Sequence, residues 1–372
     1  MSTSAIVSAQ PSMLAPLGCA MPTPMMQAAV LAQHGDIDAL RVISWPLPSP
    51  APGEVRVRVR AAALNRADLS IIRGLSGPGI RPKHLPLIPG VDLAGEIDAI
   101  GSVAADAGWA VGDRVVVYPG VFCGACRACE RGEESMCERY QIIGEERHGG
   151  FAEFTVVPVS NLERVPDGVP FDVAAAVPAT FTTAWRMLVT CAHLTPGDTV
   201  LVVGVGSGVS TAAIAIARRI GATVLGTTSV ASKADAACAL GASAVVCGYD
   251  EPFDDWVMAQ TNHRGVDVVV DSVGAATWRA SIRSLKPGGA LVVCGATSGD
   301  EPSISIRELY QNHRRVLGAP LGNRREFRRV MRLVFEGELV PVIDRRYPLT
   351  AIGEALGRLA DREQFGKIVV LP

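Results

Sequence analysis

Short apolar runs alternate with longer stretches of helical spacing from Thr199 to about Leu317. Such runs are typical of strands buried on both faces, and the stretches between them are long enough for crossover helices. The alternation therefore predicts an α/β unit with a parallel sheet that helices cover on both faces. The predicted strands are Thr199–Val203, Thr223–Thr227, Ala244–Cys247, Val266–Asp271, Ala290–Cys294 and Arg315–Leu317. The predicted helices are Val209–Ile220, Ser232–Leu240, Asp254–Gln260, Thr277–Leu285 and Ser305–Asn312.

The segment before this unit reads mostly as strands. From Gln27 to about Val117 the apolar runs are short and bounded by glycine turns, and Gly53–Asn65 alternates valine with arginine as a half-exposed strand does. A small-residue helical stretch follows at Val173–Leu188. We therefore expect a β-rich, barrel-like part that precedes the α/β unit.

The C-terminal segment is expected to return to that β-rich part. Two amphipathic helices, Arg324–Glu336 and Ala351–Ala360, precede a final strand, Gly366–Leu371. A single late strand cannot form a core of its own. We therefore expect this strand to join the N-terminal sheet.

The first strand of the alternating region runs into a glycine-rich turn and a small-residue helix. Backbone N–H groups at such a helix start can bind a diphosphate, and glycines let the ligand approach closely. The alternative is a buried turn that binds no ligand. Six alternating strands with this turn after the first match the doubly wound dinucleotide fold, which favours the binding site. The residues of the turn are Gly204, Gly206, Ser207, Gly208 and Val209.

Four cysteines lie close together on a glycine-rich, charged stretch: Cys123, Cys126, Cys129 and Cys137. This spacing matches a closed, tetrahedral four-cysteine zinc site, whose role is structural because no coordination position is open. One alternative is a set of free or oxidised thiols. Another is a zinc ribbon for nucleic acid, but the local acidic residues would repel phosphates. Those acids are Glu130, Glu133, Glu134 and Glu138.

Composition narrows the classes of function. The chain has 372 residues, of which 48% are hydrophobic, and a net charge of −2. It is long enough for two domains, and it has neither the basic surface that nucleic acid requires nor an apolar run of about 18–20 residues that could span a membrane. Residues 1–26 carry no charged side chain and are expected to form a disordered or loosely docked tail. Nine cysteines, five of them scattered singly, suit a reducing cytoplasm.

The order of these parts resembles the medium-chain dehydrogenase/reductase superfamily. The resemblance covers roughly residues 27–372 and rests on the cysteine lobe, the glycine turn and four short motifs, which are Asn65–Asp68, Pro89–Glu96, Gly112–Val116 and Gly366–Val369. It implies a six-stranded Rossmann domain at 179–318 and a GroES-like domain at 27–178 and 319–372. It also implies one structural zinc in a lobe at 123–137, and a homodimer or homotetramer.

The same resemblance indicates that a catalytic zinc is missing. Zinc alcohol dehydrogenases of this superfamily place cysteine, histidine and cysteine where this chain has Asn65, Val91 and approximately Ala179. Amide, isopropyl and methyl groups are not ligands of a tetrahedral zinc. The chain therefore resembles the branch of quinone oxidoreductases and acrylyl-CoA reductases, which implies NADPH-dependent reduction of an activated C=C bond in a small-molecule substrate. The alternatives are an alcohol or aldehyde dehydrogenase with a metal site built from Asp68 and Asp92, and a catalytically silent nucleotide-binding protein.

Four residues are candidates for the catalytic site, each with a structural alternative. Asn65 can bond substrate or nicotinamide ribose, or its own backbone at a strand end. Asp68 and Asp92 can transfer a proton, or hold the loops around the cleft as buried polar groups. Tyr118 can donate to an enolate, or pack in the core.

The cofactor residues follow the strand ends. NAD enzymes usually have an acid at the end of the second strand, and none occurs here before Asp235. Thr228 and Ser229 can donate to a 2′-phosphate and Lys233 adds charge, so NADPH is expected rather than NADH. Further contacts are expected from Thr183, Ser272, Val273, Gly295, Ala296 and Thr297. Ser210 replaces the last glycine of the family turn, and we expect it to displace the helix start slightly.

Overall fold

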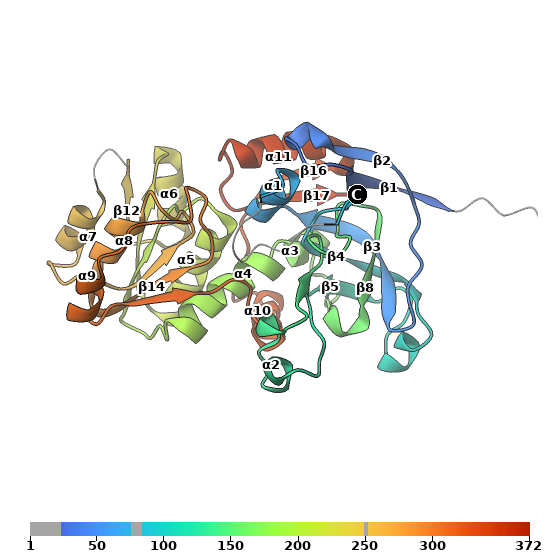
Figure 1. Cartoon of the computed structure of the whole chain (residues 1–372), viewed down its shortest axis with the longest axis horizontal. Coiled ribbons are helices and arrows are strands. Elements are labelled where there is room, and N and C mark those ends of the chain that lie inside the picture. The colour runs from blue at the N-terminus through green and yellow to red at the C-terminus, as the bar shows by residue number, and fades with distance from the viewer. Residues whose placement is uncertain (1–23, 76–83, 249–251) are drawn as a thin grey trace, which may run out of the picture.

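A computed structural model describes residues 24–75, 84–248 and 252–372 of the chain (Figure 1). Its strands form two large sheets, one in the predicted β-rich part and one in the predicted α/β unit. Helix α4 (Pro178–Trp185) lies between them. Nearly all of the predicted tail lies outside the described residues. Its last two residues, Met25 and Met26, instead begin strand β1 (Met25–Leu31). No helix of the described part is long and apolar enough to cross a membrane.

The first large sheet is the predicted parallel one. Its six strands have the order β12-β11-β10-β13-β14-β15, which is the doubly wound order 3-2-1-4-5-6. The strands are β10 (Thr199–Val202), β11 (Thr223–Thr228), β12 (Ala244–Cys247), β13 (Val266–Asp271), β14 (Leu285–Val293) and β15 (Arg315–Gly318). Its helices are α5 (Gly208–Ile220), α6 (Ala231–Leu240), α7 (Asp254–Gln260), α8 (Trp278–Arg283) and α9 (Ile306–Gln311). All six strands and five helices were predicted, and β14 begins five residues before the predicted Ala290.

Alternate residues of this sheet pack into two different cores. Val200 and Val202 of β10 belong to a core shared with α4, α5 and α10 (Arg324–Phe335). Leu201 and Val203 belong to the opposite core, which includes residues of α7 and α8. The near-continuous apolar strands follow from this burial on both faces.

The second large sheet is mostly antiparallel and joins the two ends of the chain. Its path is β16-β17-β3-β4-β5-β9, and β8 pairs with β3. The strands are β3 (Glu54–Ala63), β4 (Asp92–Ile100), β5 (Arg114–Val117), β8 (Phe154–Pro158), β9 (Leu162–Arg164), β16 (Ile343–Pro348) and β17 (Lys367–Leu371). The late strand β17 pairs with β3, which confirms its return to the N-terminal sheet. It is not alone, however, because β16 pairs with it in parallel. The sequence of β16 hid this strand, since Asp344, Arg345 and Arg346 interrupt its apolar pattern.

Smaller elements complete the β-rich part. Strands β1 and β2 (Leu40–Pro46) form an antiparallel pair, and β6 (Gly120–Val121) pairs with β7 (Gln141–Ile142) on either side of the cysteine lobe. The helices are α1 (Arg66–Ile72), α2 (Arg127–Glu130), α3 (Phe171–Ala175) and α11 (Ile352–Ala360).

The stretch predicted as one helix at Val173–Leu188 has three parts. Helix α3 ends at Ala175, and α4 begins at Pro178. The break follows from Pro178, which has no N–H to donate and so interrupts the helical hydrogen bonds, although Val177 before it keeps helical angles. A π-helix, Arg186–Cys191, continues directly from α4. The small-residue composition predicted the helical state but not these divisions.

Candidate functional site

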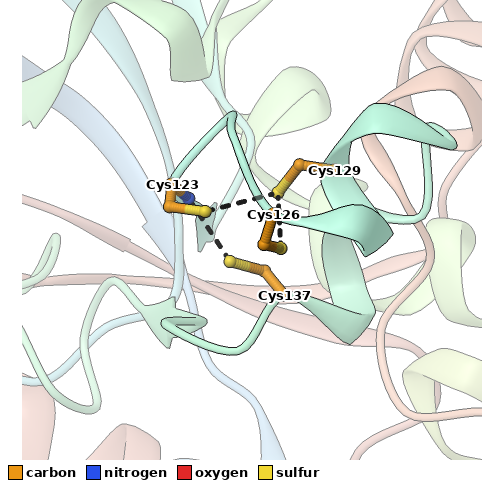
Figure 2. Close-up of side chains that lie close together, drawn as sticks. All are labelled: Cys123, Cys126, Cys129 and Cys137. Atoms are coloured by element: carbon orange, nitrogen blue, oxygen red, sulfur yellow. Dashed lines mark hydrogen bonds between the residues drawn. The ribbon is translucent and has the colours of Figure 1, made fainter.

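The four cysteines of the lobe converge on one point (Figure 2). Their sulfur atoms all lie within 4.8 Å of one another, and the Sγ of Cys129 is 3.9 Å from that of Cys123 and 3.6 Å from that of Cys126. These separations are far longer than a disulfide bond of about 2.05 Å. A tetrahedral zinc with Zn–S bonds of about 2.3 Å would separate its sulfurs by about 3.8 Å. The donor set and the spacing therefore fit a structural zinc.

Backbone N–H groups in the lobe donate hydrogen bonds to the cysteine sulfurs and so stabilise thiolates. The N–H of Cys123 and that of Arg139 both donate to the Sγ of Cys137, each at 3.3 Å. The N–H of Ala125 lowers the pKa of the Cys123 thiol to about 6. Burial instead raises the pKa of Cys129 to about 12, so zinc has to displace its proton at neutral pH.

The glycine turn has the geometry of an anion-binding helix start. Ser207 caps α5, with extended backbone angles and a side chain that accepts the N–H of Ser210 at 3.1 Å. At the other side of the turn, the N–H of Gly204 donates to the hydroxyl of Thr227 at the end of β11. The first N–H groups of α5 have no helical partner and can face an anion.

Ser210 lies in the first turn of α5, which begins at Gly208, one residue before the predicted start at Val209. The Ser210 side chain is buried, and its hydroxyl lies 2.7 Å from that of Ser207. The extra hydroxymethyl group thus takes part in the cap, and the displacement of the helix start stays a prediction.

The C-terminal segment lies directly against the turn. The N–H of Gly366 donates to the carbonyl of Gly206 at 3.0 Å. A Cβ at Gly208 would lie 2.8 Å from the Cδ of Lys367 and 2.9 Å from the Cγ2 of Thr180. Glycine is therefore needed at position 208 for packing as well as for ligand approach.

Lys367 connects the turn to the predicted catalytic residues. Its ammonium donates to Asp92 Oδ2 at 2.9 Å, to Asn65 Oδ1 at 2.7 Å and to the carbonyl of Leu64 at 2.8 Å. Asn65 also donates to Asp92 Oδ2 at 2.9 Å, and the N–H of Ala179 donates to Asp92 Oδ1 at 2.8 Å. Lys367 and Asp92 are both buried. Val91 is buried beside this cluster in the chain. The predicted positions 65, 92 and 179 are therefore brought together, with a lysine that the sequence did not single out.

Asp68 is held by the same segment but does not share these bonds. One carboxylate oxygen accepts the N–H of Asn65 at 2.7 Å, which caps α1. The other, Oδ1, is buried without a hydrogen-bond partner among the described residues. Burial raises the pKa of Asp68 to about 7, and the charges of Asp92 and Glu145 add to this, while the N–H of Asn65 and the charge of Lys367 oppose it. Asp68 is thus able to hold a proton near neutral pH.

Tyr118 lies in the core rather than at an open site. Its side chain is fully buried, and its hydroxyl donates to the carbonyl of Gly322 at 2.8 Å. Burial raises its pKa far above the ordinary value, and the nearby Tyr140 adds to the rise. The hydroxyl proton is therefore already used in this structure, which supports the packed-core alternative for Tyr118.

The candidate ribose residues follow β11. Thr228 is buried and its hydroxyl accepts the N–H of Val230, whereas Ser229 is exposed. The ammonium of Lys233 donates to the carbonyl of Arg362, and its chain passes close to Gly206. Burial lowers the pKa of Lys233. Lys233 therefore lies beside the glycine turn, Ser229 is exposed after β11, and the Thr228 side chain accepts from the backbone of its own segment.

The candidate nicotinamide residues lie on neighbouring segments. Thr183 is buried on α4, in the helix that begins beside Asp92. After β13 and β14, the N–H of Thr297 donates to the carbonyl of Ser272 at 3.4 Å, and that of Ser298 to the carbonyl of Val273 at 2.7 Å. Gly295 and Ala296 lie in the same β14 loop. The carboxyl ends of adjacent parallel strands thus meet, as the doubly wound topology requires.

Two surface hollows lie away from all these residues. One of about 510 Å³ is lined by arginines of α10 with Glu163 and Phe335, and one of about 440 Å³ by Trp45, His148 and their neighbours. Neither includes a predicted site residue.

Comparison with known proteins agrees with this architecture. Residues 51–167 match the family model of the alcohol dehydrogenase GroES-like domain, and residues 208–336 match that of the zinc-binding dehydrogenase. An acryloyl-coenzyme A reductase from Metallosphaera sedula is 31% identical over 347 residues, which are 93% of this chain and 99% of that protein.

The chain belongs to the medium-chain dehydrogenase/reductase superfamily.

Solved structures of this superfamily include both kinds of relative. An NAD-dependent alcohol dehydrogenase matches with a TM-score of 0.87 and 39% identity, over 93% of this chain and 100% of that one. A crotonyl-CoA carboxylase/reductase in complex with NADP matches with a TM-score of 0.85 and 26% identity, over 96% of each chain. These relatives are oxidoreductases, and they support a pyridine nucleotide cofactor for this chain.

Three residues near the site were missed from the sequence: Lys367, Thr180 and Thr227. Lys367 was noted only as part of a family motif, and nothing in the local sequence shows that its ammonium reaches Asp92. The two threonines contact the glycine turn from α4 and β11. Their hydroxyl and methyl groups give no spacing signal, because the contacts are made between distant segments.

Proposed function

We propose that this protein is an NADPH-dependent reductase of an activated C=C bond, in an enone, an enoyl thioester or a quinone, and that it works without a catalytic zinc. The observation that carries the proposal is the cluster of half-buried Asn65 with buried Asp92 and Lys367. Asn65 stands at one of the positions from which zinc alcohol dehydrogenases hold their metal, and Asp92 directly follows Val91 at another. The polar groups of the cluster are an amide, a carboxylate and an ammonium ion.

The charges of the cluster disfavour a metal. Lys367 already supplies a positive charge to Asp92, and a zinc ion beside it would experience repulsion from the ammonium. Both oxygens of Asp92 are engaged, one by Ala179 and the other by Asn65 and Lys367. A soft or imidazole ligand set, as zinc requires, is not formed by these residues.

Reduction of an activated double bond does not need a Lewis acid at the attacked carbon. NADPH, when bound, supplies a hydride, which carries two electrons to the β-carbon, and a proton completes the reduction at the α-carbon. The carbonyl oxygen takes up the intermediate charge, which hydrogen-bond donors stabilise. In this chain Asp68 can hold a proton near pH 7. The Asn65 amide and the Lys367 ammonium already donate within the cluster, so either would bind a substrate oxygen by exchanging one of these bonds.

The cofactor preference is supported by the end of β11. No carboxylate follows the strand there to bind the ribose hydroxyls. Ser229 is exposed and Lys233 lies beside Gly206, so a 2′-phosphate would meet a hydroxyl donor and a cation. These features favour NADPH over NADH.

An alcohol dehydrogenase is the second candidate, because one of the structural relatives is an alcohol dehydrogenase with 39% identity. That reading needs a metal site built from Asp68 and Asp92. Within residues 24–75, 84–248 and 252–372, the cysteine lobe is the only group of three or more potential ligands whose atoms converge. The carboxylates of Asp68 and Asp92 therefore have no third potential metal ligand close to both of them among the described residues.

A panel of acceptors, run with each nicotinamide cofactor beside metal analysis, tests the proposal. We expect one zinc per chain and NADPH-dependent loss of an enone, enoyl thioester or quinone. Two zincs per chain, with primary-alcohol oxidation that a chelator abolishes without unfolding the chain, would establish the second candidate instead. Tight NADPH binding without turnover of any acceptor or alcohol would instead support the catalytically silent nucleotide-binding protein.

A further inference from the structure

A buried guanidinium joins the cysteine lobe to the rest of the molecule. Arg186 donates through Nη2 to Glu133 of the lobe at 2.8 Å and through Nη1 to Glu326 of α10 at 3.0 Å. The side chains of Arg186 and Glu326 are each 5% exposed, and that of Glu133 is 30% exposed. Thr190 also donates to Glu326. Two segments that are far apart in the chain are thus held by one positive charge.

The buried charge of Arg186 is stabilised by the carboxylates of both Glu133 and Glu326. Burial opposes the charge of Arg186, but the hydrogen bonds and charges of Glu133 and Glu326 outweigh it and raise the pKa of the guanidinium. Glu326 has a second task, because it accepts the N–H of Asn323 at 2.6 Å and so caps α10. Among the described residues, the Glu133 carboxylate bonds only Arg186, and it is the partner that the lobe contributes. Loss of Glu133 would leave Arg186 with one carboxylate in a poorly solvated place.

Arg186 lies at the end of the helix that carries a candidate cofactor residue. Helix α4 is bonded to Asp92 near its first residue, through the N–H of Ala179. It carries Thr183, and the π-helix begins immediately after it at Arg186. Such π-helical turns are rare and depend on their surroundings. One end of α4 is therefore fixed by the Asn65–Asp92–Lys367 cluster and the other by Glu133 and Glu326.

We infer that Glu133 is a positioning residue that couples zinc in the cysteine lobe to binding of the nicotinamide cofactor through Arg186 and α4. The inference rests on the proposed cofactor contact of Thr183. Zinc fixes Cys129 and Cys137, and Glu133 lies on the short loop between them. Without zinc this loop loses its anchors, and α4 loses one of the bonds that hold its end.

Linkage makes the coupling measurable from both sides. If zinc in the lobe tightens cofactor binding, bound cofactor must tighten zinc binding by the same factor. The readout is the equilibrium distribution of zinc between the loaded chain and a chromogenic chelator, with and without NADPH. We expect saturating NADPH to shift this distribution toward the chain about fivefold or more, which is the lower range of coupling between distinct sites.

Three variants separate Glu133 from the lobe as a whole. Glu133→Ala should abolish the effect of NADPH on zinc, and Glu133→Gln should retain part of it, because an amide oxygen can still accept from Arg186. Glu130→Ala is the matched control, since it removes the same charge from the same lobe and the Glu130 carboxylate has no bond among the described residues. It should keep the wild-type shift.

The outcomes are distinct. Equal shifts in Glu133→Ala and in the wild type, or no shift in a wild-type chain that binds NADPH, would overturn the inference and leave the proposed function standing. A folded wild-type chain that binds neither NADPH nor NADH would overturn the proposed function, and the inference with it. Circular dichroism of each variant shows that the comparison is made between folded chains.

Discussion

The ammonium of Lys367 lies 2.9 Å from the carboxylate of Asp92, although 275 positions separate the two residues. Asp92 begins β4 and Lys367 begins β17, and both strands neighbour β3 in the same sheet. The Lys367 stem also packs against Gly208 at the start of α5. A single side chain thus connects the proposed reaction site, the glycine turn and the C-terminal strand.

Removing the ammonium should be costly. Lys367→Met leaves Asp92 ionised and buried without its cation, and we expect a loss of about 3 kcal/mol in the free energy of unfolding. Denaturation in urea measures this change. Lys286→Met is the control, because Lys286 forms an ion pair with Asp267 and its side chain is 43% exposed. Loss of this ion pair should lower the free energy of unfolding by less than about 1 kcal/mol. Similar losses in the two variants would contradict the buried pair.

The carboxyl of Asp68 should make stability fall as the pH rises. Its pKa of about 7 in the folded chain is above the value of 3.8 for the free side chain, so the folded state holds the proton longer than the unfolded state. The contribution is therefore largest below about pH 4 and is lost between about pH 4 and 7.

Asp68→Asn removes this titration and can keep the bond to the N–H of Asn65. From pH 5 to pH 8, the stability of the variant relative to the wild type should improve by about 3 kcal/mol. Chemical denaturation at the two pH values gives the difference. A relative stability that does not change with pH would mean that Asp68 is ionised throughout this range.

Zinc binding by the cysteine lobe should depend on pH. Burial raises the pKa of Cys129 to about 12, so binding at neutral pH releases at least its proton. The apparent zinc affinity should therefore fall at least about tenfold for each unit of pH lowered between 8 and 6. Chelator competition at several pH values measures the slope. A pH-independent affinity would show that all four thiols are already ionised in the metal-free lobe.

An acid introduced after β11 should reverse the cofactor preference. Ser229 is exposed, so Ser229→Asp is expected to fold normally. Its carboxylate would repel a 2′-phosphate and accept from ribose hydroxyls, which should weaken NADPH binding about tenfold or more and strengthen NADH binding. Titration of nicotinamide fluorescence gives both dissociation constants. Ser229→Ala controls for loss of the hydroxyl alone, and an unchanged preference in Ser229→Asp would place the 2′-phosphate elsewhere.

Much of the fold could be predicted because its signals are local. The strands of the six-stranded sheet are buried on both faces, so each of them has an apolar run that predicts it from its own sequence. Strand β16 escaped detection because it is an edge strand whose arginines face solvent. The boundary between α3 and α4 also has a local cause, which is Pro178. It was not predicted because the small residues around it show no hydrophobic periodicity.

The sequence by itself determined the four-cysteine lobe and the glycine turn, and through the family resemblance it predicted Asn65 and Val91 at positions of zinc ligands. These features depend on which side chains are present and on short spacings that the chain preserves. Only the tertiary structure decided that Lys367 neutralises Asp92, that Tyr118 bonds Gly322 in the core, and that Arg186 unites Glu133 with Glu326. Each of these contacts joins segments that are distant in the sequence and that the fold brings together. Burial then decides the chemistry, because a charge or hydroxyl removed from water must find its partner in whatever segment lies beside it.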